Sequence, residues 1–219
     1  MSYINIHIGG GDCMERGRLI ALEGPDGSGK TTQIQLLEKH LKELGYEVVR
    51  TREPGGTEIS EKIREIILDN DNCNMSYMCE ALLYAASRAQ LVCEVIKPAL
   101  DLGKIVICDR FVYSSMVYQG IGRGLGMDRI KSINEAALDG LEADLIFMIT
   151  IPYEEGLKRK KMQKTLDRLE NSGNEFHKKV FEGYLDICRK YGKIEVVDGN
   201  RSVDEIHKDI INIIKKLKL

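Results

Sequence analysis

A glycine-rich segment at residues 24–31, GPDGSGKT, has the spacing GxxxxGK[ST] of a phosphate-binding loop. Its glycines let successive backbone N–H groups turn toward an anion at points where a Cβ would intrude. Lys30 can reach the β- and γ-phosphates of a bound nucleotide, and the Thr31 hydroxyl can ligate Mg²⁺. An ordinary glycine-rich turn is the alternative, but the apolar run before the segment and the helical pattern after it favour phosphoryl-transfer chemistry.

Two charged residues, Asp109 and Arg110, follow a second apolar run at residues 104–108. A carboxylate at the end of a buried strand beside a phosphate loop commonly helps to hold the metal ion, so Asp109 is a candidate Mg²⁺ ligand, directly or through water. The planar guanidinium of Arg110 suits a second phosphate group. The alternatives are that Asp109 only caps the next helix and that Arg110 forms a surface salt bridge.

The elements that must position these residues alternate between strand and helix. Apolar runs predict strands at residues 18–23, 47–50, 104–109, 144–151 and 195–197. Helical spacing predicts helices at residues 31–44, 59–67, 75–102 (with a kink near Pro98), 111–118, 128–138, most of 153–191, and from a capping box at 202–205 onward. This alternation predicts an α/β fold of the P-loop NTPase type, with a parallel sheet of about five strands and helices on both faces.

The domain organisation follows from the same pattern. Residues 17–219 are expected to form a single domain, because no internal repeat or linker interrupts them. Residues 1–16 fit the pattern poorly, since an alternating segment at 3–8 ends at three glycines. They are compatible with an edge strand, a disordered lead or an appended segment.

Composition excludes several classes of protein. The 219 residues are 43% hydrophobic and 30% charged with a net charge of −2, so no global basic field predicts a nucleic-acid partner. No apolar run reaches the ~20 residues of a membrane span, and the start of the chain lacks the pattern of a secretory signal. The six cysteines form no CxxC pair and are expected to be reduced thiols, which predicts a cytoplasmic protein with no membrane partner.

Four segments in this order, LEGPDGSGKTT at 22–32, TREPGGT at 51–57, DRFVYSSMVYQG at 109–120 and LDRLE at 166–170, together resemble the thymidylate kinase (dTMP kinase) family of the bacterial or archaeal type. The resemblance covers about residues 18–217. It implies ATP- and Mg²⁺-dependent phosphorylation of dTMP to dTDP by direct in-line transfer, in dTTP biosynthesis, by a homodimer to which the apolar segment 82–95 could contribute.

The resemblance also implies roles for individual residues. Arg110 and Arg64 would bind the phosphate of dTMP, Tyr84 would stack on the base, Tyr118 would lie near C2′ of the sugar, and Glu53 near the sugar and metal. Arg88, Ser115 and Gln119 would make polar contacts to the base. The full dTMP-binding set is Glu53, Arg64, Tyr84, Arg88, Arg110, Ser115, Tyr118 and Gln119. From the residues alone, Tyr84 could be a core side chain, Arg64 and Arg88 could be solvated helix arginines, and Gln119 could only end a helix.

The donor side and the catalytic residues are implied in the same way. ATP binding falls to Gly24, Pro25, Asp26, Gly27, Ser28, Gly29, Lys30, Thr31 and Thr32, and Mg²⁺ to Thr31, Asp109 and Asp26, partly through water. The implied catalytic residues are Lys30, Asp26, Arg110 and Arg168.

The chain departs from the family pattern at two positions. Gly27 stands where some members carry an arginine, so a mobile helical lid at about 158–174 is expected to supply a cation, with Arg168 as the candidate; an exposed charged helix without a catalytic role is the alternative. Phe111 replaces a common Tyr or His and costs a hydroxyl.

Three other functions compete with this hypothesis. A deoxynucleoside kinase is disfavoured because its acceptor carries no phosphate for Arg110 and Arg64. A regulatory GTPase would need an Asn-Lys-x-Asp segment, and no Asn-Lys dipeptide occurs. A non-catalytic nucleotide-binding module is hard to reconcile with the intact Lys30 and Thr31.

Overall fold

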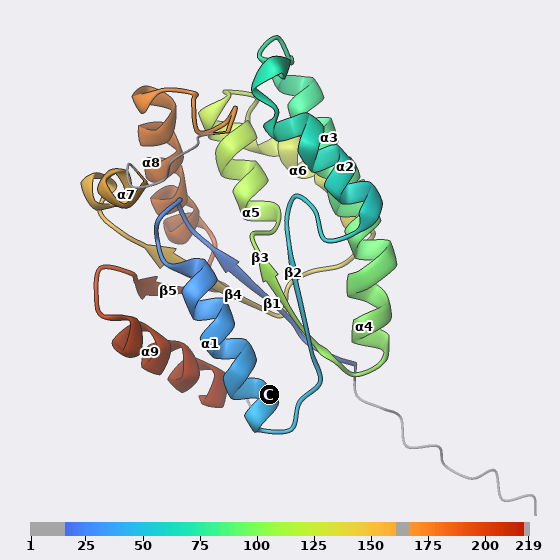
Figure 1. Cartoon of the computed structure of the whole chain (residues 1–219), viewed down its shortest axis with the longest axis vertical. Coiled ribbons are helices and arrows are strands. Elements are labelled where there is room, and N and C mark those ends of the chain that lie inside the picture. Colours follow the sequence, from blue (N-terminus) through green and yellow to red (C-terminus); the bar gives the residue numbers. More distant parts are fainter. Residues whose placement is uncertain (1–15, 161–166, 217–219) are drawn as a thin grey trace, which may run out of the picture.

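A five-stranded, fully parallel sheet with strand order β2-β3-β1-β4-β5 forms the centre of the computed structural model, which describes residues 16–160 and 167–216 (Figure 1). The strands are β1 (Leu19–Glu23), β2 (Val48–Arg52), β3 (Ile105–Asp109), β4 (Leu145–Thr150) and β5 (Ile194–Asp198). Each predicted strand is present, and its bounds differ from the prediction by one or two residues. The predicted fold class is thus confirmed.

Alternation along β1 explains why both faces of the sheet need a helical cover. Leu19 and Ala21 point to one apolar cluster, whereas Ile20 and Leu22 point to another, and all four are fully buried. Side chains of successive strand residues face opposite sides, so a strand that is apolar at every position must be covered on both. Helices α1 and α9 pack together on the Ile20 face, and the helical segments from α3 to α4 cover the Leu19 face (Figure 1).

The helices follow the predicted order. They are α1 (Lys30–Glu43), α2 (Glu58–Leu68), a 3₁₀ turn (Asn70–Asn72), α3 (Tyr77–Leu91), a π-helical turn (Val92–Ile96), α4 (Lys97–Asp101), α5 (Val112–Ser115), a second π-helical turn (Met116–Gly122), α6 (Met127–Leu138), α7 (Tyr153–Lys160), α8 (Asn174–Lys190) and α9 (Val203–Lys216). The helix predicted at 75–102 is present as α3, the first π-helical turn and α4, which follow one another without a break. The capping box before α9 is confirmed, because Ser202 Oγ accepts from the Glu205 amide while the Glu205 carboxylate accepts from Ser202.

Register brings three loops to one edge of the sheet. Asp109 at the end of β3 is opposite Arg52 of β2 and Leu22 of β1. The Glu53 amide donates to the Asp109 carbonyl at 3.0 Å, and the Arg110 amide donates to the Leu22 carbonyl at 2.9 Å. The residues that follow β1, β2 and β3 are thereby held side by side, where ligands bind in such sheets.

Two segments named in the sequence analysis lie partly outside the described residues. These are the N-terminal extension, of which only Arg16 is described, and the lid, of which 161–166 are not. Within the described ranges, no helix combines the length and apolar character that a membrane crossing requires.

Candidate active site

The phosphate loop is a tight turn between β1 and α1 that closes around the Lys30 side chain. Lys30 Nζ donates to the carbonyl oxygens of Gly24 and Pro25, each at 2.9 Å. Gly29 precedes α1 with a φ of +92°, a conformation that glycine adopts without strain. Burial, together with the positive charge of Arg110, lowers the pKa of Lys30 to about 8. The carboxylates near the Lys30 ammonium therefore offset only part of the cost of burying it.

Oxygen ligands for a metal ion gather beside the loop. Thr31 Oγ1 lies 3.4 Å from Asp109 Oδ2, and α5 has no side-chain cap, so Asp109 does not serve as a helix cap. Among the described residues no group of three or more His, Cys, Asp or Glu side chains could hold a metal alone. A hydroxyl and a carboxylate fit Mg²⁺, which keeps several waters and takes further oxygens from substrate phosphates.

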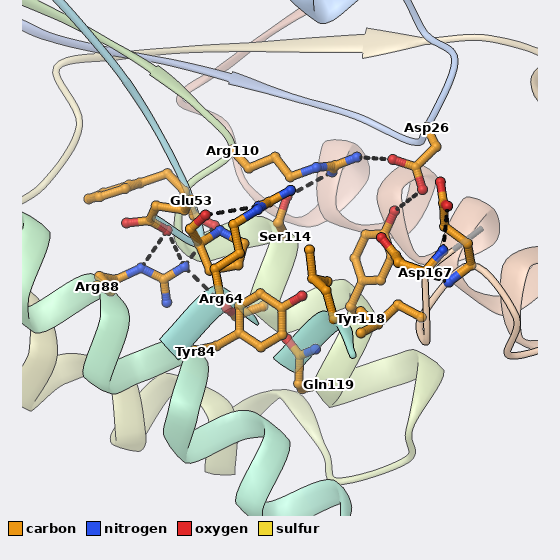
Figure 2. Close-up of a pocket in the computed structure, with 16 residues that line it drawn as sticks. Asp26, Glu53, Arg64, Tyr84, Arg88, Arg110, Ser114, Tyr118, Gln119 and Asp167 are labelled. Atoms are coloured by element: carbon orange, nitrogen blue, oxygen red, sulfur yellow. Dashed lines mark hydrogen bonds and ion pairs between the residues drawn. The ribbon is translucent and has the colours of Figure 1, made fainter. Parts of the chain in front are cut away.

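A cavity of about 200 Å³ lies next to the phosphate loop (Figure 2). Its lining includes all eight predicted dTMP-binding residues. The lining residues are Asp26, Glu53, Pro54, Arg64, Leu68, Tyr84, Arg88, Arg110, Phe111, Ser114, Ser115, Tyr118, Gln119, Asp167, Leu169 and Glu170. The predicted dTMP-binding residues, which come from segments far apart in the sequence, are thus brought together at one cavity.

Arg110 connects this cavity to the phosphate loop. Its guanidinium donates to the Gly24 carbonyl at 2.9 Å and forms an ion pair with Asp26 at 2.5 Å. It also contacts Ser114 Oγ at 3.1 Å and the Tyr184 hydroxyl at 2.8 Å. The backbone of Arg110 has a φ of +69°, which is uncommon outside glycine and indicates that the surrounding contacts hold the residue in place.

The buried carboxylate of Glu23 stabilises the turn that follows Arg110. It accepts hydrogen bonds from the amides of Phe111 and Ser114, at 2.9 and 3.1 Å, and from Ser114 Oγ at 2.5 Å. Burial raises the pKa of Glu23 to about 7, although these hydrogen bonds and the charge of Arg110 oppose the rise. Glu23 therefore holds the end of β1 and the start of α5 together.

Arg88 is a fully buried cation rather than a solvated helix arginine. It forms an ion pair with the carboxylate of Glu53, which is also buried, and it donates a hydrogen bond to Asn134 Oδ1. Its NH2 group donates to the Phe111 carbonyl at 3.2 Å and to Ser115 Oγ at 3.1 Å. The Arg88 guanidinium is thus oriented from several sides before any ligand binds.

The remaining predicted residues lie around the same cavity. Arg64 donates to the Pro54 carbonyl at 2.9 Å. The Tyr118 hydroxyl donates to Asp26 at 3.1 Å, while the guanidinium of Arg110 lies 5.3 Å from the centre of the Tyr118 ring. Tyr84 lines the cavity as a partly exposed ring, so it is not a fully enclosed core side chain (Figure 2).

Among the lid arginines that the structure describes, Arg159 contacts the phosphate loop and Arg168 does not. Arg159 on α7 donates to the Gly27 carbonyl at 3.2 Å, and a Cβ on Gly27 would lie 3.2 Å from that of Arg159. Arg168 instead pairs with the buried Glu80 at 2.7 Å and donates to the Ile67 carbonyl at 2.7 Å. The physical reason is that a buried carboxylate needs cationic partners. The side chains of Lys160, Lys161 and Lys164 lie outside the described residues.

Several residues of the site were not among those predicted from the sequence. Glu23, Ser114 and Tyr184 form the support of Arg110, and Glu80 and Asn134 hold Gln119 and Arg88. Only Glu23 had a visible hint, because it is a charged residue at the end of an otherwise apolar strand. The partners of Tyr184 and Glu80 are tens of residues away, so only the fold reveals them.

Comparison with known proteins agrees with this arrangement. The family model described as thymidylate kinase matches residues 22–210. The chain belongs to the thymidylate kinase family. It is 49% identical over 197 residues to the thymidylate kinase of Finegoldia magna, covering 90% of this chain and 97% of that one. It is 46% identical over 205 residues to that of Clostridium novyi, covering 92% and 100%.

A solved structure supports membership of the thymidylate kinase family at the level of the fold. The crystal structure of thymidylate kinase from Ehrlichia chaffeensis superposes with a TM-score of 0.74 at 32% identity, covering 91% of this chain and 99% of that one. The matched region contains the phosphate loop, the Arg110 turn and the described ends of the lid. The site is therefore the site of a kinase of this family.

Proposed function

We propose that the protein transfers the γ-phosphoryl group of ATP to dTMP and forms dTDP. The observation that carries this proposal is the place of Arg110, which contacts Asp26 and Gly24 of the phosphate loop and also lines the neighbouring cavity. A guanidinium between the two sites can bind the phosphate of an acceptor nucleotide at the point where the donor phosphate arrives.

The cavity has the side chains needed to bind a nucleoside monophosphate as the acceptor. Arg110 and Arg64 bind its phosphate, because both line the same cavity as cations that are partly shielded from water. Tyr84 provides a ring for the base, and Arg88 and Gln119 provide polar contacts to its edge. Tyr118 takes the place near the sugar, where its ring disfavours a ribose hydroxyl.

The donor side uses the phosphate loop. Its backbone N–H groups and Lys30 bind the triphosphate, while Thr31 and Asp109, with Asp26, would hold Mg²⁺. The metal ion would supply charge neutralisation at the β- and γ-phosphates. Because phosphoryl transfer depends mainly on positioning and electrostatics, direct in-line transfer needs no covalent intermediate on the protein.

The lid completes the site by excluding water. Helix α7 lies against Gly27, and Arg159 reaches the phosphate loop, so a cation is available for charge that develops on the transferred group. Asp167 and Glu170, in the described C-terminal part of the lid, line the acceptor cavity. Closure over both nucleotides would bring these ends of the lid into one site.

We also infer a homodimer and a cytosolic location. Exposed apolar side chains gather on the neighbouring helices α2 and α3, which supports an interface between copies of the chain. These side chains are Ile59, Ile66, Tyr77 and Leu82. All five cysteines within the described residues are free thiols, which supports a reducing compartment.

A coupled assay of ADP release tests the proposed reaction. We expect ADP to form only when ATP, Mg²⁺ and dTMP are all present, with loss of turnover on adding EDTA and recovery on adding excess Mg²⁺. ATP hydrolysis that is independent of dTMP, or nucleotide binding without turnover on any acceptor, would contradict the proposal.

A further inference from the structure

The amide of Gln119 is held by a carboxylate that does not itself line the acceptor cavity. Gln119 Nε2 donates to Glu80 Oε1 at 2.9 Å. Gln119 is 1% exposed and Glu80 is 0% exposed, so water does not compete for this contact. Of these two residues, Gln119 lines the cavity (Figure 2) and Glu80 is not part of its lining.

Two arginines form ion pairs with the Glu80 carboxylate. Arg123 contacts both carboxylate oxygens, at 3.2 and 3.1 Å, and Arg168 lies 2.7 Å from Oε2. An ionised carboxylate accepts hydrogen bonds and cannot donate them. The amide of Gln119 therefore has to turn its NH₂ group toward Glu80, and this fixes the side of the amide on which its carbonyl oxygen lies.

The side-chain carbonyl oxygen of Gln119, Oε1, is buried and has no hydrogen-bond partner among the described residues. Buried polar atoms are nearly always paired in native proteins, so an unpaired acceptor beside a ligand cavity points to a donor on the ligand. The imide N3–H of thymine or uracil is such a donor. Cytosine carries a lone pair at N3 and would face the Gln119 oxygen with a second acceptor.

We propose that Glu80 is a positioning residue that determines base specificity, because it orients Gln119 as a hydrogen-bond acceptor toward an imide pyrimidine. This inference rests on the proposed function, in which the base of dTMP occupies the cavity. Glu80 selects against cytosine without touching the substrate, since the selection depends only on which end of the Gln119 amide faces the base.

The variant Glu80→Gln tests the proposal. A neutral carboxamide can donate to Gln119, so the Gln119 amide is free to reverse and present its NH₂ group to the base. We expect KM for dTMP to rise with a smaller change in kcat. The ratio of kcat/KM for dTMP to that for dCMP should fall at least about tenfold, which is the discrimination expected of one well-formed hydrogen bond. An unchanged ratio in a folded variant would overturn the proposal.

A control separates orientation from general damage to the ion-pair cluster. Arg123→Lys perturbs the same carboxylate but does not contact Gln119, so it should lower thermal stability and leave the dTMP to dCMP ratio unaltered. A fall in the ratio as large as that of Glu80→Gln would mean that the cluster acts only through stability, and would also overturn the proposal.

A second variant and a measurement on the natural chain decide the matter if Glu80→Gln does not fold. Glu80→Asp keeps the charge for both arginines but withdraws the carboxylate from Gln119, so the same fall in ratio is expected. In the natural chain, the Gln119 side-chain amide protons should be protected from solvent exchange before dTMP is added. Rapid exchange in the free protein would overturn the proposal.

The failure of this proposal is distinguishable from failure of the proposed function. If the natural chain does not phosphorylate dTMP, the proposed function is wrong. If it phosphorylates dTMP and prefers it over dCMP, but Glu80→Gln and Glu80→Asp retain that preference, only the role of Glu80 is wrong.

Discussion

Arg110 and Asp26 form a 2.5 Å ion pair that joins the acceptor cavity to the phosphate loop. The carboxylate belongs to the phosphate loop, and the guanidinium lines the neighbouring cavity that we propose as the acceptor site. Tyr118, which also lines the cavity, donates to the same carboxylate at 3.1 Å. The two substrate sites are thus connected through side chains that are already in contact in the free protein.

Replacement of Arg110 should affect the acceptor more than the donor. We expect Arg110→Ala to lower kcat/KM for dTMP at least about 100-fold, because the variant loses a charge-assisted contact to the acceptor phosphate. The KM for ATP should change little. Steady-state kinetics with each substrate varied in turn measures both effects. Arg50→Ala, on an exposed arginine paired with Glu38, is the matched control and should retain activity. A near-normal kcat/KM for dTMP in Arg110→Ala would show that Arg110 does not bind the acceptor.

Binding of a nucleoside triphosphate should take up a proton above pH 8. The pKa of Lys30 is lowered to about 8 by burial in the free protein, and an added triphosphate raises it again by supplying negative charge. Calorimetric titration of a non-hydrolysable ATP analogue at pH 8.5, in buffers of different ionisation enthalpy, measures the uptake, which should be about three-quarters of a proton because about one quarter of the lysine is already protonated at that pH. Lys30→Met serves as the comparison and should take up none. Equal proton uptake in both proteins would assign the proton to another group.

Glu23 should make the folded state less stable as pH rises. Its pKa is about 7 in the folded protein and 4.5 in a model peptide, so its stabilising protonation is complete below pH 4.5 and is lost as pH rises through 7. At 1.36 kcal/mol per pH unit, this loss reaches about 3 kcal/mol at most. Glu23→Gln has no titrating carboxyl group at this position. Its free energy of unfolding should therefore rise relative to that of the natural chain as the pH increases from 5 to 8. Urea unfolding at several pH values measures the difference, and a pH-independent difference would contradict the prediction.

The two lid arginines should behave differently when truncated. Arg159→Ala removes a cation beside Gly27 and should lower kcat about tenfold or more with little change in melting temperature. Arg168→Ala leaves Glu80 with one fewer cationic partner in a buried site, so it should lower the melting temperature by several degrees.

The control for this pair of variants is Lys179→Ala, which removes an exposed ion pair on α8. Thermal melts and kcat should both stay close to those of the natural chain. If Arg168→Ala reduced kcat strongly without any change in melting temperature, Arg168 would be acting on the transferred phosphoryl group and the structural role given to it would be mistaken.

The fold could be predicted from the sequence because its signals are local. Buried strands such as 19–23 appear as unbroken apolar runs, and the GxxxxGK[ST] spacing marks the turn that follows. Family resemblance then indicated Arg110, Arg88 and Gln119, all of which line one cavity in the structure.

The rest of the site depends on contacts between distant segments. Glu80 and Gln119 are 39 residues apart, and Arg110 and Tyr184 are 74 apart, so no periodicity connects them. Arg168 was expected at the phosphate loop because it lies in the lid, which is rich in lysine and arginine. Charge composition does not say which of these cations forms an ion pair with a buried carboxylate, and in the structure Arg168 pairs with Glu80. Arg159 has the same composition around it and lies at Gly27 because α7 packs there.

The most direct test of the central claim is a phosphoryl-transfer assay of the full chain with dTMP, dUMP, dCMP, dAMP and thymidine as acceptors at equal ATP and Mg²⁺. Membership of the thymidylate kinase family predicts the highest kcat/KM for dTMP. The arrangement of Arg110 and Arg64 around one cavity predicts negligible transfer to thymidine, which has no phosphate for them to bind. A clear preference for thymidine would contradict the account, because it would leave both arginines without a role in binding the acceptor.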